Sequence, residues 1–250
     1  MSSKRFDALL AMIAPVSDAP VASSIFIYGQ PGSGKTRFVG SVSEHLKTLI
    51  IKAEEGTLSI SDSGADAIPI HDATSLKNLR AKIDAILDFL ESPEGKEAYE
   101  AVAIDSFSAL TATAIRFFTE GGKKMQIQDW GELSGWIERI NHRFTSLSQL
   151  SIGICHSVDI DNSDSKRGET RFTIRPDLPG KLRETITRYY DVSAYAYTVP
   201  DKDPDAFPVQ MASIGNPGDK LTVKDRAGRL PNRLRLNYGE WLKAINGGES

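Results

Sequence analysis

One eight-residue motif constrains the fold of this chain more than any other feature: Gly29-Gln30-Pro31-Gly32-Ser33-Gly34-Lys35-Thr36. It fits the pattern G-x-x-x-x-G-K-[ST], with an apolar run at 25–28 before it and a helical pattern at 35–47 after it. Glycines let the backbone amides turn inward, and the following helix adds its positive end, so a polyphosphate would meet preformed donors. The motif therefore predicts an α/β fold with a phosphate-binding loop.

The motif also assigns roles to single residues. We expect the loop and the next residue, Arg37, to bind ATP, with the Lys35 ammonium at the β and γ phosphates and facing solvent when no ligand is bound. The Thr36 hydroxyl should ligate Mg²⁺. No asparagine-lysine-x-aspartate motif for guanine is present, which favours ATP over GTP. The alternative interpretation is a glycine-rich turn with an exposed lysine.

A buried strand at 101–104 should deliver Asp105 at its carboxyl end. Next to a phosphate-binding loop, such an aspartate is expected to hold the metal together with Thr36, although a purely structural aspartate at a strand end is the alternative. The following residue is Ser106 and not glutamate. A water-activating carboxylate must therefore come from another strand.

Two neighbouring carboxylates, Glu54 and Glu55, follow the predicted strand 49–51. Glu54 is the candidate general base for water attack on the γ phosphate, with Glu55 left open and a solvated acidic turn as the alternative. His156 follows the predicted strand 152–155 and should lie beside the same site, either as a γ-phosphate sensor or as an ordinary surface histidine. These positions share one edge of a parallel sheet, where ligands bind.

The alternation of strands and helices predicts an α/β fold with a mostly parallel, doubly wound sheet. Helices are expected at 35–47, 74–90 and 129–150, the last with a core-facing stripe from Trp130 to Leu147. In the back third, a helix at 179–189, an extended segment at 191–199 and a hairpin of 209–214 with 221–223 predict an antiparallel extension. We expect an N-terminal extension at 1–20, a mobile loop at 157–170 and one domain over 1–250.

Composition narrows the possible partners. The formal net charge is −3, which excludes a uniformly basic nucleic-acid wrapper or a polybasic membrane binder, and no apolar stretch is long enough to span a membrane. Residues 220–243 are locally basic, so they could meet DNA phosphates, a neighbour's triphosphate or only solvent. The single cysteine, Cys155, favours packing over metal binding or a disulfide, and a reducing cytoplasm as the compartment.

Several segments together resemble the RecA-like phage nucleotide-binding ATPases that include the Sak-type single-strand annealing proteins. Beyond the phosphate-binding loop, the resemblance rests on Ala53-Glu54-Glu55-Gly56-Thr57-Leu58-Ser59, Ile104-Asp105-Ser106, Asp129-Trp130-Gly131, Pro179-Gly180-Lys181-Leu182 and Lys224-Asp225-Arg226-Ala227-Gly228-Arg229-Leu230-Pro231. It covers nearly the whole chain. One departure is Lys52, where such ATPases often carry aspartate.

The resemblance implies a RecA-like core that hydrolyses ATP, forms homo-oligomers and acts on single-stranded DNA, often beside a single-strand DNA-binding protein. It implies that Glu54 is the catalytic glutamate, that Lys224 and Arg226 reach across a subunit boundary to a neighbour's γ phosphate, and that 121–124 and 157–170 face DNA. Lys224 and Arg226 are expected to project from one outer face, separated from their own phosphate-binding loop by the sheet order.

The expected function is therefore slow, DNA-stimulated ATP hydrolysis in phage recombination by single-strand annealing, in the host cytoplasm if the chain is phage-encoded. Two other classes stay open. A P-loop small-molecule kinase would need an arginine-rich lid and an acceptor pocket, and a non-catalytic adaptor would use ATP only to control assembly.

Overall fold

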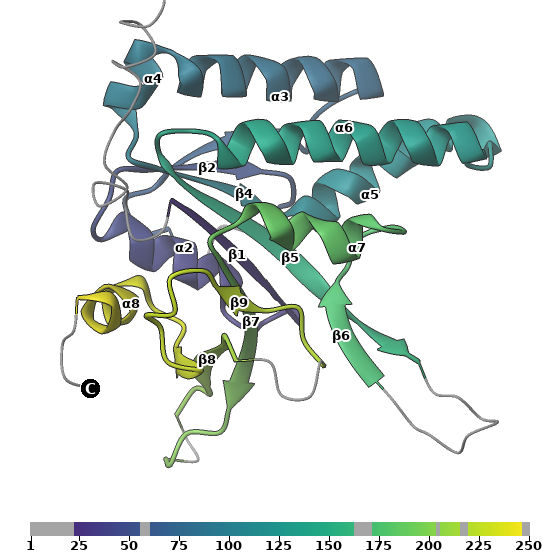
Figure 1. Cartoon of the computed structure of the whole chain (residues 1–250). Helices are drawn as coiled ribbons and strands as arrows, with labels where there is room; N and C mark the ends of the chain where they lie inside the picture. Colours follow the sequence, from purple (N-terminus) through teal and green to yellow (C-terminus); the bar gives the residue numbers. More distant parts are fainter. Residues whose placement is uncertain (1–22, 56–60, 163–171, 204–205, 216–219, 247–250) are drawn as a thin grey trace, which may run out of the picture.

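The computed structural model describes residues 23–55, 61–162, 172–203, 206–215 and 220–246 (Figure 1). Its main element is one sheet with the strand order β10-β8-β7-β1-β5-β4-β2-β3. The strands are β1 Ser24–Gly29, β2 Thr48–Lys52, β3 Asp66–Pro69, β4 Ala101–Asp105, β5 Leu150–Asp161, β6 Phe172–Pro176, β7 Val192–Val199, β8 Val209–Ser213, β9 Lys224–Asp225 and β10 Arg233–Arg235.

The sheet is parallel in its core and antiparallel at its carboxyl-terminal side. β1 runs parallel to both of its neighbours, β5 and β7, and β4, β2 and β3 continue the parallel part. β8 and β10 are added antiparallel next to β7, while β6 and β9 pair antiparallel with β5 and β7. The expected fold class is confirmed.

Helices cover both faces of the sheet (Figure 1). α3, α5 and α6 pack on one face, and α2 and α8 contact each other on the opposite face. The helices are α2 Lys35–Ser43, α3 Leu76–Glu91, α4 Pro93–Ala98, α5 Phe107–Phe118, α6 Ile127–Thr145, α7 Leu182–Thr185 and α8 Tyr238–Ile245, with short 3-10 helices η3 Glu120–Gly122 and η4 Ile186–Tyr189.

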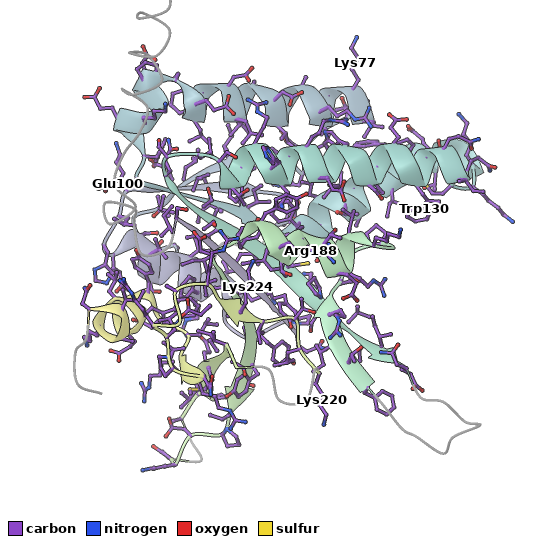
Figure 2. All side chains as sticks on the ribbon, in the orientation of Figure 1. Lys77, Glu100, Trp130, Arg188, Lys220 and Lys224 are labelled. Carbon is purple, nitrogen blue, oxygen red and sulfur yellow. The ribbon has the colours of Figure 1, made fainter. Side chains whose placement is uncertain are left out.

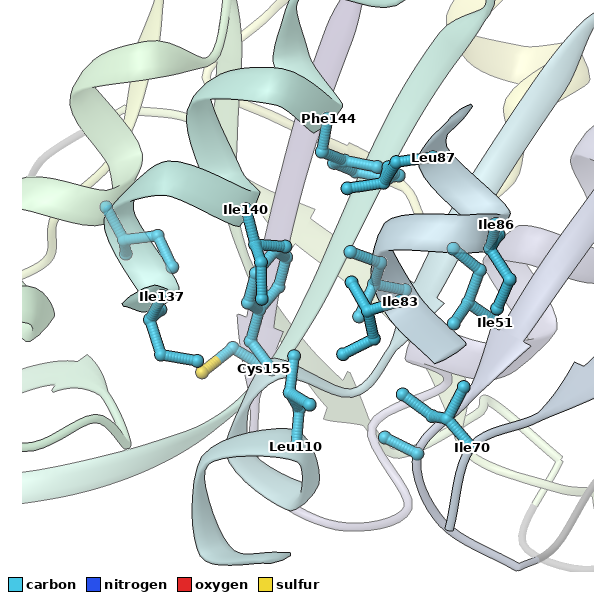
Figure 3. Close-up of a cluster of buried hydrophobic side chains, with 14 of the residues drawn as sticks. Ile51, Ile70, Ile83, Ile86, Leu87, Leu110, Ile137, Ile140, Phe144 and Cys155 are labelled. Carbon is cyan, nitrogen blue, oxygen red and sulfur yellow. The ribbon is translucent and has the colours of Figure 1, made fainter. Parts of the chain in front are cut away.

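Two apolar cores follow from this layering, because alternate residues of a strand point to opposite faces. Phe26 and Tyr28 of β1 pack toward α3, α5 and α6, while Ile25 and Ile27 pack toward α2 and α8. Figure 3 shows the first core, where Ile83, Leu110 and Ile140 converge from three helices. Burial on both faces explains why the parallel strands read as unbroken apolar runs in the sequence.

The helix expected at 129–150 is observed at 127–145, and its stripe differs at the first position. Trp130 is 39% exposed and Ile127 is 88% exposed, whereas Trp136 is 4% exposed. The first turns of α6 extend past the sheet (Figure 1), so an apolar residue there has no core to pack against. Leu133, which lies about one helical turn after Trp130, is fully buried.

Two expectations about the back of the chain are wrong in part. The residues 157–161 are not a loop but continue β5 into an antiparallel ribbon with β6, while 163–171 lie outside the described residues. The hairpin of 209–214 with 221–223 is not formed, because β8 pairs with β7 and β10 instead. The segment near Thr222 instead contacts β1, where the backbone N–H of Thr222 donates to the Tyr28 hydroxyl at 2.7 Å. The expected turn at 216–219 and the extension at 1–20 lie outside the described residues.

Candidate functional site

The phosphate-binding loop joins β1 to α2 and is shaped by its glycines. Gly32 and Gly34 have φ of 78° and 94°, a backbone region that disfavours residues with a Cβ. Gly34 forms the N-cap of α2, so the free N–H groups of the first helical turn face the loop. At Gly29, a Cβ would collide with the carbonyl oxygen of Ala196 on β7. The loop therefore holds a concave backbone surface at the carboxyl edge of the sheet.

Lys35 lies inside this loop and does not face solvent, which corrects the sequence expectation. Its Nζ donates to the carbonyl oxygens of Gly29 at 2.9 Å and Gln30 at 2.8 Å, and the residue is only 6% exposed. Burial lowers the pKa of the Lys35 ammonium below its ordinary value. The ammonium thus sits in the loop, where an anion would compete with the two carbonyls for it.

Thr36 and Asp105, the two predicted metal ligands, are in direct contact. The Thr36 hydroxyl donates to Oδ2 of Asp105 at 2.8 Å, and Asp105 is 7% exposed at the end of β4. Burial raises the pKa of the Asp105 carboxyl above its ordinary value. A hydroxyl and a carboxylate are hard oxygen ligands of the kind that Mg²⁺ prefers, so the donor set fits this ion.

Glu54 and His156 meet beside the loop. Glu54 Oε2 lies 3.6 Å from His156 Nε2, and hydrogen bonding to His156 and Ser106 holds the pKa of Glu54 below its ordinary value. The backbone N–H of His156 donates to the Ser108 hydroxyl at 2.8 Å, which fixes the strand next to the histidine. Glu55 is exposed at the next position. Glu54 is therefore the more constrained of the two glutamates.

These side chains surround one cleft of about 360 Å³. It is lined by Pro31, Gly32, Gly34, Lys35, Thr36, Arg37, Lys52, Glu54, Glu55, Asp105, His156 and Gln210. Sequence reasoning missed Gln210, which comes from the antiparallel strand β8. The pattern predicted a strand there, but nothing in the sequence indicated that this strand would lie within reach of the loop.

Lys224 and Arg226 lie away from this cleft. β9 pairs with Val192 and Ser193 at the amino end of β7, whereas the loop lies at the carboxyl end of β1. Because β7 is the direct neighbour of β1, the separation comes from the length of the strands and not from the sheet order.

Both cations already have partners within the chain. Arg226 Nη1 lies 3.0 Å from Asp191 Oδ1 and its Nη2 donates to the Arg188 carbonyl at 3.3 Å. Lys224 Nζ donates to the same carbonyl at 2.9 Å (Figure 2). The Arg226 side chain nevertheless keeps 60% of its surface exposed. It is therefore accessible to another molecule.

The family model described as "AAA domain" matches residues 22–227, which include every segment of the cleft. The chain belongs to this AAA domain family. Membership supports the nucleotide-binding P-loop ATPase core that the sequence resemblance implies. No curated protein matches the chain significantly.

Solved structures that are partly similar to this chain include a flagellar accessory protein and ATPases of type III secretion systems. The flagellar accessory protein FlaH from Methanocaldococcus jannaschii has 14% identity and a TM-score of 0.39, over 93% of this chain and 90% of FlaH. A prototypical ATPase of the type III secretion system of pathogenic bacteria has 10% identity and a TM-score of 0.44, over 70% of this chain and 51% of that one. EscN of enteropathogenic E. coli, solved with its central stalk EscO, has 11% identity and a TM-score of 0.44, over 72% and 43%. Similarity at this level assigns no substrate or partner.

Among the described residues, no helix of the AAA domain chain is both long and apolar enough to cross a membrane.

Proposed function

We propose that this AAA domain protein binds Mg²⁺·ATP in the cleft and hydrolyses it, and that residues 1–250 work as one RecA-like ATPase domain. The observation that carries the proposal is the convergence of Lys35, the Thr36–Asp105 pair and Glu54 on one cleft, from three separate strand ends. A lysine for phosphate charge, a hydroxyl–carboxylate pair for a metal and a carboxylate for water are the parts that phosphoryl transfer to water needs.

Each side chain then has one task. Lys35 exchanges its two carbonyl partners for oxygens of the β and γ phosphates. Thr36 and Asp105 would hold Mg²⁺, which would supply positive charge against the phosphates. Glu54 orients the attacking water and accepts its proton, because its carboxylate is ionised near neutral pH and lines the cleft. His156 holds Glu54 in place and senses the γ phosphate.

Self-assembly is the second part of the proposal. Lys224 and Arg226 serve a neighbouring copy's γ phosphate, which is supported by their distance from their own cleft and by the exposure of Arg226. In that complex Arg226 gives up its contact with Asp191. A cation supplied in this way acts on charge that develops only in the transition state.

The third part concerns the polymer on which the protein acts. We propose single-stranded DNA, annealed during phage recombination in the host cytoplasm beside a single-strand DNA-binding protein. The sequence resemblance and the basic segment 220–243 support this role. Lys123 and Lys124 add two exposed cations beside η3. The compartment rests on Cys155, a single buried thiol.

One experiment tests the proposal: the steady-state rate of phosphate release with and without short polythymidine. We expect a slow basal rate that DNA stimulates, and binding of DNA that weakens as salt rises. Glu54→Gln should bind ATP and lose a factor of about 10² to 10⁴ in rate, whereas Glu55→Gln should stay near the wild-type rate.

The other function classes give different results. A kinase would transfer the γ-phosphoryl group to an acceptor, so that no phosphate is released, and DNA would have no effect. Arg37 is the one arginine in the described lining of the cleft, where a kinase lid would need several. An adaptor would bind ATP with no turnover. Wild-type protein that binds no ATP would refute the proposal altogether.

A further inference from the structure

Gln210 lines the cleft, and the proposed reaction does not use it. It lies on β8, opposite Thr198 of β7, and its side chain covers the α-carbon of Gly34. The contact is close enough that a Cβ built on Gly34 would lie 2.8 Å from Cγ of Gln210 and would collide with its amide carbon and oxygen. The amide group is therefore packed directly on the phosphate-binding loop.

The amide of Gln210 has hydrogen-bonding capacity that the described residues leave unused. A glutamine side chain carries two N–H donors and one carbonyl acceptor. Within the described part of the chain, no hydrogen bond to this side-chain amide is formed, although the Gln210 backbone carbonyl accepts from the N–H of Leu236 at 3.0 Å. The backbone is thus fixed, and the half-buried residue lines the cleft with amide donors that no described residue occupies.

The neighbouring backbone shows which group would meet this amide. Gly34 is the N-cap of α2, and the N–H groups behind it attract an anion to this point. Lys35 and Thr36, the next two residues, line the same cleft. A phosphate bound in the loop would therefore lie beside the amide. A neutral amide donor would add a hydrogen bond to this phosphate, while the negative charge of the phosphate would still be balanced by Lys35 and the metal.

We propose that the side-chain amide of Gln210 donates a hydrogen bond to the polyphosphate of the bound nucleotide, and so acts as a nucleotide-binding residue supplied by the antiparallel extension. The inference rests on the proposed ATP binding in this cleft. It also gives β8 a role, because the strand that carries Gln210 is tied to β10 and, through Leu236, to the segment before α8.

Two substitutions separate the hydrogen bond from the packing. Gln210→Met keeps a side chain of similar length on Gly34 but has no amide, and Gln210→Glu keeps the shape but replaces the donors with a negative charge. The matched control is Thr198→Ala, because Thr198 lies directly opposite on β7, is exposed and does not line the cleft. All three variants should match the thermal stability of the nucleotide-free wild type.

The measurement is the dissociation constant of a fluorescent ATP analogue with Mg²⁺, at low and at high salt. Loss of one hydrogen bond to a charged group predicts about tenfold weaker binding for Gln210→Met. Gln210→Glu should bind more weakly still, and the gap between the two variants should narrow at high salt because repulsion between charges is screened. Thr198→Ala should bind as the wild type does.

The outcomes distinguish this inference from the function on which it rests. If the wild type binds the analogue and Lys35→Ala does not, but Gln210→Met binds as tightly as the wild type, the amide has no role and the inference is wrong. If the wild type itself does not bind, the proposed function and the inference both fall. Equal weakening in Thr198→Ala would assign the effect to the strand and would also overturn the inference.

Discussion

Replacing Lys35 by alanine should destabilise the protein even when no nucleotide is present. The ammonium donates to two carbonyl oxygens of its own loop, those of Gly29 and Gln30. Hydrogen bonds to a charged group contribute roughly 1.5–3 kcal/mol each to stability. Two effects reduce the net value: burial of the ammonium is unfavourable, which is why its pKa is lowered, and water in the open cleft can replace it. We therefore expect Lys35→Ala to lower the free energy of unfolding by about 2 kcal/mol.

Thermal unfolding of the nucleotide-free protein measures this loss. For a chain of this size, about 2 kcal/mol corresponds to a fall in Tm of roughly 4–8 °C. Arg37→Ala is the matched control, because Arg37 is an exposed cation two residues further along the same helix, and its loss should change stability by less than about 0.5 kcal/mol. Mg²⁺·ATP should raise the Tm of the wild type and of Arg37→Ala more than that of Lys35→Ala.

An unchanged Tm in Lys35→Ala would refute the structural role of the ammonium, because the two carbonyls would then need no partner. A Lys35→Ala protein that still gains the wild-type increase in Tm with Mg²⁺·ATP would refute the assignment of the loop itself.

Three further predictions concern other parts of the molecule. Glu54 has a lowered pKa in the folded state, so it contributes stability above pH about 4.5 that is lost as the pH falls through the folded pKa. In a plot of Tm against pH, Glu54→Gln should therefore show a smaller fall of Tm toward acid pH than the wild type. An equally steep fall would contradict the pairing of Glu54 with His156. Gly153→Ala should cost about 1–3 kcal/mol in urea unfolding, because its methyl would lie 2.5 Å from the Tyr190 hydroxyl, and a wild-type midpoint would count against this packing. Mixing Arg226→Ala with Lys35→Ala should restore part of the ATPase activity, and a mixture that co-assembles but stays inactive would rule out action across subunits.

Much of the cleft could be predicted because its parts depend on local sequence. The loop carries its own turn chemistry in Gly32 and Gly34, and Asp105 and Glu54 each follow a short apolar run that only a buried strand explains. In a parallel sheet these strand ends meet at one edge whatever the strand order is. That Glu54, Asp105 and His156 lie at one edge therefore needed no knowledge of the register, whereas their convergence on one cleft also depends on the strand order β1-β5-β4-β2.

The rest depends on pairing between distant segments, which local patterns do not encode. The position of Gln210 follows from the register of β8 on β7, and the failure of the expected hairpin has the same cause. Trp130 fits the helical period of α6, but the period does not tell where the sheet beneath the helix ends. Lys35 looked solvent-facing because the sequence does not show that the carbonyls of its own loop would turn toward it.

The position of β1 in the sheet determines the order in which this chain can fold as it leaves the ribosome. Both neighbours of β1 come late in the sequence, since Ile25 pairs with Ile152 on one side and with Val192 on the other. β2, β3 and β4 can pair among themselves much earlier. Long-range pairing of this kind is slow, and an apolar strand that waits for its partners is exposed to aggregation. The segment that carries the nucleotide loop can thus join the parallel sheet only after β5 has emerged, and its second neighbour, β7, follows later still.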